Sequence, residues 1–309
     1  GLTNCLAVNP TTSFSAGGEV AGPAQCAFRR RDAFTGVSYT AGVEFKPIED
    51  ILLYAKTAKG FRAGGQNLRA PSQVALLPFD PEIAYSYEVG VKAEVLDRRL
   101  RINLAAYTSD VNGIQRSTLV STPPVPPSTI AGTATLVGNA GKARFRGIET
   151  EVTAQLFDGF TLSASGSLIE PKYIRYADLS GDRSFEAFNG VSKQQFTLGA
   201  DYSVPLGEKA QLNLHADYNW RGRTPLDSYD YAPNPNNAAI VSALSAPPTG
   251  LLNGRVAVVL DEALEIGVFG RNLTNNRNYT QNQLVAPIGY ISATRQEPRT
   301  YGVTASYSF

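Results

Sequence analysis

Several residue types are scarce in this sequence, and their scarcity excludes whole classes of protein. The 309 residues include one His, two Cys, one Trp and no Met. So few His and Cys leave no metal-binding spacing, and neither a G-x-S-x-G nucleophile motif nor a phosphate-binding loop is present. We therefore expect no enzyme, no metal site and no cofactor.

Long apolar runs and a surplus of one charge are also lacking. No stretch approaches the roughly 18 consecutive apolar residues that a membrane-crossing helix requires. The 28 Lys and Arg nearly balance the 27 Asp and Glu, so nothing attracts nucleic acid. Neither an initial Met nor a signal peptide begins the chain, and we expect it to start after processing or within a longer protein.

The sequence contains instead a repeated alternation of apolar and polar residues. Leu212 and Leu214 share one parity, for example, while Asn213 and His215 share the other. The alternation predicts eleven strands, at residues 33–46, 51–62, 81–96, 99–114, 143–156, 160–173, 191–204, 209–221, 250–260, 264–274 and 298–309. Most have about ten residues or more, which is the length needed to cross a bilayer at a tilt.

The connections between these strands alternate between short turns and long loops. Short turns are expected at 47–50, 97–98, 157–159, 205–208 and 261–263, and long loops without strands at 63–80, 115–142, 174–190, 222–249 and 275–297. Short turns on one rim and long loops on the other are typical of outer-membrane barrels. A soluble β-sandwich or propeller is the alternative, although one core could hardly bury so many long strands.

We therefore predict an all-β fold, a transmembrane antiparallel β-barrel, for residues 33–309. The apolar parity would face lipid, including Val89, Val91, Val152, Leu198, Leu212 and Leu214. The first and eleventh predicted strands run in the same direction, so we expect further strands upstream of Gly1.

Residues 1–32 precede the first predicted strand and would form an extracellular loop. Cys5 and Cys26 lie in this segment and are the only cysteines. A pair that closes a short loop forms a disulfide in an oxidising compartment, and two reduced thiols are the alternative. We expect the disulfide if this loop lies outside the cell.

Several segments resemble known outer-membrane proteins. The last strand, with Tyr307 and the terminal Phe309, is similar to the strand that the barrel assembly machinery reads in such proteins. Other segments resemble the C-terminal barrel half of TonB-dependent receptors. These are YAKTAKGFRAGG at 54–65, FDPEIAYSYEVGVKAEVLDRRLRINLAAY at 79–107, NAGKARFRGIETEV at 139–152, FGRNLTNNRNY at 269–279 and PRTYGVTASYSF at 298–309. Their order and spacing cover nearly the whole chain from Ala33 onward.

The resemblance implies eleven strands of a 22-stranded barrel in the outer membrane of a Gram-negative bacterium. It also implies a plug domain, absent from this sequence, that couples the barrel to the TonB complex. Charged lumen residues would contact this plug: Glu88, Glu94, Arg101, Glu149 and Glu151. The implied function is uptake of a scarce solute such as a siderophore, cobalamin or glycan, and a passive porin or structural barrel is the alternative.

Ligand contacts are expected in the loops and the upper lumen, where aromatic and cationic side chains can hold a polar ring or a chelate. The candidates are Tyr173, Arg175, Tyr176, Arg221, Arg223, Tyr229 and Tyr231. Asp178, Asp182 and Glu186 share one loop, but their spacing fits no calcium motif, so a solvated loop is expected there.

Three smaller features carry local expectations. His215 has the polar parity and is expected to be an ordinary residue of the lumen wall. Gly60 and Gly147 are expected to let strands bend or backbones approach closely at the barrel wall. The segment from Asn272 to Tyr279 is expected to cap turns and to adopt left-handed backbone.

Overall fold

The computed structural model describes residues 3–4, 19–20, 31–67, 78–122, 132–178, 181–226, 242–285 and 290–309. These residues form strands, turns and irregular segments. No helix in the described part of the chain is long and apolar enough to cross a membrane.

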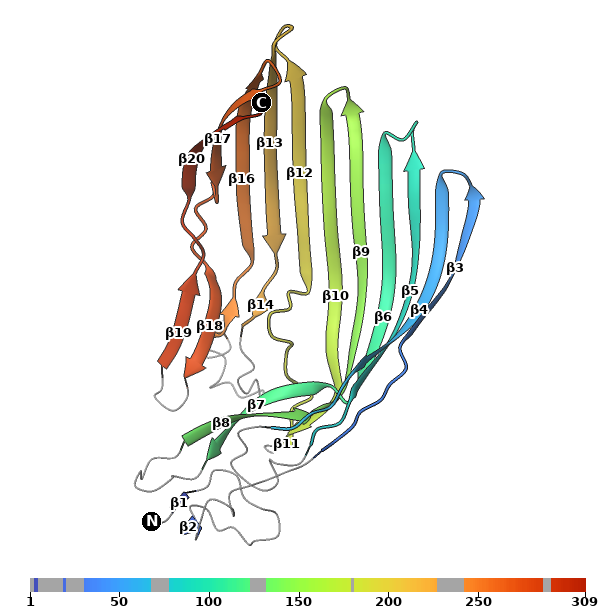
Figure 1. The fold of residues 1–309 in the computed structure, drawn as a ribbon, viewed down its shortest axis with the longest axis vertical. Coiled ribbons are helices and arrows are strands. Elements are labelled where there is room, and N and C mark those ends of the chain that lie inside the picture. The colour runs from blue at the N-terminus through green and yellow to red at the C-terminus, as the bar shows by residue number, and fades with distance from the viewer. Residues whose placement is uncertain are drawn as a thin grey trace.

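Eleven strands form one continuous antiparallel sheet in which each strand lies beside its neighbour in the chain (Figure 1). They are β3 (Tyr39–Ile48), β4 (Ile51–Arg62), β5 (Glu82–Val95), β6 (Leu100–Asn112), β9 (Gly141–Phe157), β10 (Phe160–Asp178), β12 (Gln194–Pro205), β13 (Ala210–Arg221), β16 (Thr249–Leu260), β17 (Leu264–Arg271) and β20 (Thr300–Tyr307). The predicted number of strands and their antiparallel order are confirmed.

The register of the sheet sorts side chains onto two faces. One row joins Ile102, Val152, Ala164, Leu198, Tyr218 and Leu252 across six strands. The neighbouring row on the opposite face joins Asn103, Glu151, Ser165, Thr197, Asn219 and Leu251. We call these the apolar face and the polar face. The six residues predicted to contact lipid all lie on the apolar face, because partners in adjacent strands share a face.

The connections at one rim of the sheet are short, as predicted. Asp261 and Glu262 both have positive φ, at 46° and 57°, which is the geometry of a tight hairpin turn. Gly159 also has positive φ, at 81°, in the turn between β9 and β10. These short turns place consecutive long strands side by side.

The prediction that the long loops contain no strands was wrong. The connection between β6 and β9 contains the ribbon β7 (Gln115–Thr122) and β8 (Gly132–Asn139), and β18 (Tyr279–Val285) pairs with β19 (Tyr290–Arg295). Short pairs also join β14 (Thr224–Pro225) to β15 (Ser245–Ala246) and β10 to β11 (Gly181–Asp182). The prediction relied on the proline and glycine of these segments. The rest of their backbone still needs hydrogen-bond partners, and pairing into short strands supplies them.

Two strand boundaries also differ from the prediction. β3 begins at Tyr39 and continues past Pro47 to Ile48, where the register with β4 shifts. Pro47 lies within this register shift, at the irregular end of β3, where the ladder with β4 needs no donor from it. β10 continues five residues beyond the predicted end and reaches Asp178.

Before β3, the described residues form one short antiparallel pair of strands, β1 (Thr3–Asn4) and β2 (Glu19–Val20). Cys5 and Cys26 lie outside the described residues, so the disulfide stays a prediction. The assignment of residues 1–32 to an extracellular loop likewise stays a prediction.

Candidate functional site

The polar face carries charged side chains that bond across neighbouring strands. Glu88 accepts a hydrogen bond from the Tyr54 hydroxyl at 2.7 Å and pairs with Lys56 at 2.9 Å. Glu94 accepts from Nε of Arg101 at 2.9 Å. Three of the five predicted plug-contact residues therefore already form ion pairs within the wall.

The other two, Glu149 and Glu151, line a polar pocket of about 570 Å³ on the same face. Arg221, one of the predicted ligand residues, lies in the same pocket and in the same ladder row as Glu149. Asn103 donates to Glu151 at 3.2 Å. The structure thus places Arg221 in one pocket with Glu149 and Glu151, which precede it by 72 and 70 residues in the sequence.

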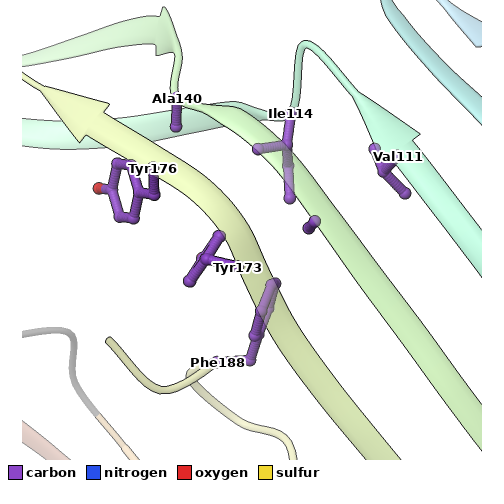
Figure 2. Close-up of a cluster of buried hydrophobic side chains, with 7 residues drawn as sticks. Val111, Ile114, Ala140, Tyr173, Tyr176 and Phe188 are labelled. Atoms are coloured by element: carbon purple, nitrogen blue, oxygen red, sulfur yellow. The ribbon is translucent and has the colours of Figure 1, made fainter. Parts of the chain in front are cut away.

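A cluster of buried aromatic and aliphatic side chains lies at the long-loop ends of β6, β9 and β10 (Figure 2). The rings of Tyr173 and Phe188 stack at 4.0 Å, and Phe145 meets Phe188 edge-on at 4.9 Å. The guanidinium of Arg116 lies 5.7 Å from the Tyr173 ring centre and 5.8 Å from that of Phe188. The cluster fixes this arginine at the rim by cation–π attraction.

Beside this cluster lies a second pocket, of about 620 Å³. Arg223 is exposed and lines it, together with Tyr173 and Phe188. Tyr173 is only 1% exposed and Tyr176 only 4%, so both residues support the rim from within. Arg223 is the predicted ligand residue that this pocket leaves open to solvent.

The remaining predicted ligand residues are not gathered with these. Arg175 is exposed and follows a register shift in β10, where it pairs with Lys142 of β9. Tyr229 and Tyr231 lie outside the described residues. Arg221 and Arg223 are therefore the two arginines among the described candidates that line these pockets.

Arg116 and Phe188 were missed by the sequence reasoning because both fall in segments predicted as loops. A signal for Arg116 was present, since Gln115–Thr122 reads QRSTLVST and is rich in β-forming residues. Nothing in the sequence near Phe188 indicates that its ring packs against Tyr173.

Side-chain hydrogen bonds attach the loops to the ends of the strands. The Gln115 side chain donates to the carbonyl oxygens of Ala63 at 2.9 Å and Asp80 at 3.1 Å. The Asn139 side chain donates to the carbonyls of Asp80 at 2.9 Å and Gly113 at 2.7 Å. These bonds join three loop segments into one rim.

The described carboxylates form no metal site. Asp182 accepts hydrogen bonds from the hydroxyl and the backbone N–H of Ser184, at 2.7 and 3.0 Å, and these bonds lower the pKa of its carboxyl. Glu186 pairs with Arg183. Within the described ranges, no three His, Cys, Asp or Glu side chains gather in a way that could hold a metal ion.

His215 lies among acidic residues on the polar face. Its Nδ1 is 2.7 Å from Asp201 and its Nε2 is 3.3 Å from Asp217. Asn253 also donates to Asp217, at 2.8 Å. The histidine belongs to a polar network of the wall, and its predicted ordinary role stays a prediction.

The C-terminal residues lie at the edge of the sheet. Tyr307 is opposite Leu264 of β17, and its ring is 6.2 Å from that of Phe309. Both rings are exposed. This position leaves them accessible to another protein, and their role as an assembly signal stays a prediction.

Comparison with known protein families identifies the family of this chain. The family model described as TonB dependent receptor-like, beta-barrel, matches residues 10–273. The chain belongs to this family. Barrels of this family lie in the outer membrane of Gram-negative bacteria, and so does the barrel to which this chain contributes.

Relatives with related sequences are siderophore and metallophore receptors. A probable TonB-dependent siderophore receptor, PiuA of Acinetobacter baumannii, is 26% identical over 185 residues, covering 54% of this chain and 22% of the relative. The ferric-pyoverdine M114 receptor PbuA of Pseudomonas sp. is 23% identical over 241 residues, covering 78% of this chain and 26% of the relative. The chain therefore spans about a quarter of the length of these relatives.

Solved receptors share the fold of this receptor barrel. The ferric yersiniabactin uptake receptor FyuA of Yersinia pestis matches with a TM-score of 0.67 and 17% identity, over 88% of this chain and 37% of that one. The ferric-catecholate import receptor Fiu of E. coli matches with a TM-score of 0.64 and 18% identity, over 100% of this chain and 40% of that one.

Membership fixes the orientation of the receptor barrel. In outer-membrane barrels the short turns are periplasmic and the long loops extracellular. The apolar face therefore contacts lipid and the polar face lines the lumen. The aromatic cluster, Arg116 and Arg223 consequently lie at the extracellular rim, while the Arg221 pocket lies in the lumen wall.

Proposed function

We propose that this chain forms the C-terminal part of the wall of a receptor that imports a metal–siderophore chelate. The observation that carries the proposal is the family match over residues 10–273, joined to relatives whose names describe siderophore and metallophore receptors. A receptor of this kind needs groups that hold an anionic chelate at the rim and along the lumen.

Three arginines supply such groups on the path from the rim to the lumen. Arg116 is held over the rings of Tyr173 and Phe188, Arg223 lines the adjacent pocket, and Arg221 lines the pocket in the lumen wall. Guanidinium groups bind carboxylate and other oxyanions through paired N–H donors, so they suit the oxygen-rich surface of a chelate.

The proposed receptor also needs a plug and coupling to the TonB complex. Glu149 and Glu151 are the strongest candidates for plug contact, because the pocket keeps them open to the lumen. Glu88 and Glu94 already bond to Lys56 and Arg101 in the wall, so a plug would compete with those partners. Charge-assisted hydrogen bonds from plug cations would hold it against the wall.

The test uses the full-length gene that contains this chain, expressed in cells that lack their own siderophore receptors. Uptake of radioactive iron is measured with a panel of ferric chelates, with the proton gradient intact or collapsed. We expect uptake of at least one chelate that stops when the gradient is collapsed. Gradient-independent uptake would contradict the proposal and favour a passive porin.

A pair of variants tests the arginines within the same assay. Arg221→Gln and Arg223→Gln should each weaken chelate binding to cells by about tenfold, since a hydrogen bond to a charged group contributes roughly 1.5–3 kcal/mol. Arg98→Gln removes an equal charge from a periplasmic turn and serves as the control. Unchanged affinity in both arginine variants would exclude these residues from the site.

A further inference from the structure

The lipid-facing surface changes character abruptly near the extracellular rim. On β9 the outward residues Leu156, Ala154, Val152, Thr150 and Ile148 are followed by Arg146, Arg144 and Lys142. From Leu156 to Ile148 the strand covers about 27 Å at about 3.4 Å per residue, and a tilt of about 40° reduces this to a height of about 20 Å. The apolar band of an outer-membrane barrel is about 25 Å tall. Arg146, two residues beyond Ile148, therefore lies near the upper limit of the hydrocarbon.

Register places neighbouring charges on the same outward surface. One row joins Lys59, Tyr85, Asp110, Arg144 and Lys172, and the row below it joins Thr108, Arg146 and Glu170. Contacts between side chains agree with this placement. Lys59 lies 5.7 Å from the Tyr85 ring centre, and Asp110 bonds to both Arg144 at 2.5 Å and Lys142 at 3.0 Å.

This surface, which we call the cationic band, carries more positive than negative charge. Its six cations are Lys59, Lys142, Arg144, Arg146, Lys172 and Arg175, which lies opposite Lys142, and its acids are Asp110 and Glu170. Arg144 and Lys142 share Asp110, whereas Arg146 and Lys172 form no ion pair with any residue that the structure describes. Both of these are exposed. The rows of Arg144 and Arg146 thus leave two cations open at the height of the outer headgroups.

We propose that the cationic band binds the phosphate groups of a phosphorylated lipid in the outer leaflet. The band points away from the lumen, so it cannot contact a solute that passes through the barrel. Arginine and lysine both bind phosphate, arginine through paired N–H donors. Basic surfaces beside the hydrocarbon bind anionic headgroups, and Tyr85 and Tyr87 add the aromatic side chains that favour this interface. This inference is independent of the proposed function.

The test compares lipid retention by full-length receptor variants purified in detergent. The double variant Arg146→Gln with Lys172→Gln removes the two open cations and leaves the Asp110 pairs intact. The control, Arg98→Gln with Lys209→Gln, removes two charges at the periplasmic rim. The probes are lipid A, which carries two phosphates, and chemically dephosphorylated lipid A. Retained lipid is counted by native mass spectrometry, and gel mobility before and after heating confirms that each barrel is folded.

We expect wild type and control to retain lipid A and the double variant to bind it about 25-fold more weakly, because each cation near a charged membrane surface contributes about fivefold. Dephosphorylated lipid A should bind wild type as weakly as lipid A binds the variant. Equal retention of lipid A by wild type and double variant would overturn the proposal. Displacement of the lipid by inorganic phosphate at millimolar concentration would also overturn it, because the band would then be a free-phosphate site.

Discussion

At the scale of single residues, Gly147 shows why a small residue is needed in the lumen wall. A Cβ atom built on Gly147 would lie 2.6 Å from the Tyr107 ring and 2.8 Å from the Leu168 carbonyl oxygen. The expected close approach at this glycine is confirmed. Gly60 differs, because the nearest atom to its added Cβ is Ala84 Cβ at 3.8 Å, so no close approach occurs there.

This difference yields a prediction with a built-in control. Gly147→Ala should destabilise the barrel by about 1–3 kcal/mol, because Tyr107 must move and the Leu168 backbone cannot. Gly60→Ala should have little effect. Denaturant unfolding of the full-length receptor in vesicles measures both, and equal stability of the two variants would show that the Tyr107 ring moves freely.

The assignment of faces gives a second prediction for single residues. Val89 lies in the middle of the lipid-facing surface, so Val89→Lys should reduce stability by about 2–4 kcal/mol. Thr153 lies on the lumen face, and Thr153→Lys should refold normally. Refolding yield into bilayers distinguishes them. Equal tolerance of lysine at both positions would refute this assignment of faces.

Parity along the sequence was sufficient to predict which face each wall residue occupies, because alternation depends on one strand alone. The pocket of Glu149, Glu151 and Arg221 was not predictable. It depends on the register among β9, β10, β12 and β13, and register is set by turns and bulges that alternation does not specify.

At the scale of elements, the spanning strands and the extracellular ribbons were predicted with different success. Spanning strands must alternate strictly because one side meets lipid and the other meets water. The ribbon of β7 and β8 has no such constraint, since both of its faces lie beyond the membrane. The prolines that lie between its two strands in the sequence therefore led to the prediction of a loop.

Asn139 provides the test of how this ribbon is attached. Asn139→Ala removes its hydrogen bonds to the Asp80 backbone and to the Gly113 carbonyl. We expect faster amide hydrogen exchange at Asp80 and at residues 113–115, with the spanning part of β6 unchanged. Asn213→Ala removes two bonds, from Ser203 and Gln211, in the lower wall and serves as the control. Unchanged exchange at the rim in Asn139→Ala would show that the ribbon is held by other contacts.

At the scale of the whole molecule, the sheet has two open edges. β3 and β20 are the edge strands, and they run in the same direction because nine antiparallel strands separate them. Two such edges cannot complete an antiparallel ladder with each other, and unpaired backbone groups in hydrocarbon cost several kcal/mol each. The odd number of strands was predictable from the turns alone.

We therefore predict that residues 1–309 expressed alone do not form a closed barrel. Gel mobility should be the same before and after heating, whereas the full-length receptor should migrate faster when unheated. Protease digestion of the refolded material should reach β3 and β20 in the fragment and neither in the full-length protein. A compact, protease-resistant band from the fragment would contradict the prediction.

The direction of the two edge strands also determines which separate polypeptide can pair with this sheet to close a barrel. A second copy related by rotation about the barrel axis would place β20 of one copy parallel to β3 of the other, so the chain is protected against closing on itself as a homodimer. An antiparallel fit requires a partner sheet with an odd number of strands whose outer two both run opposite to β3 and β20. The receptor could accordingly be divided at this point into two separately translated pieces, and only the unlike pair would reconstitute a pore.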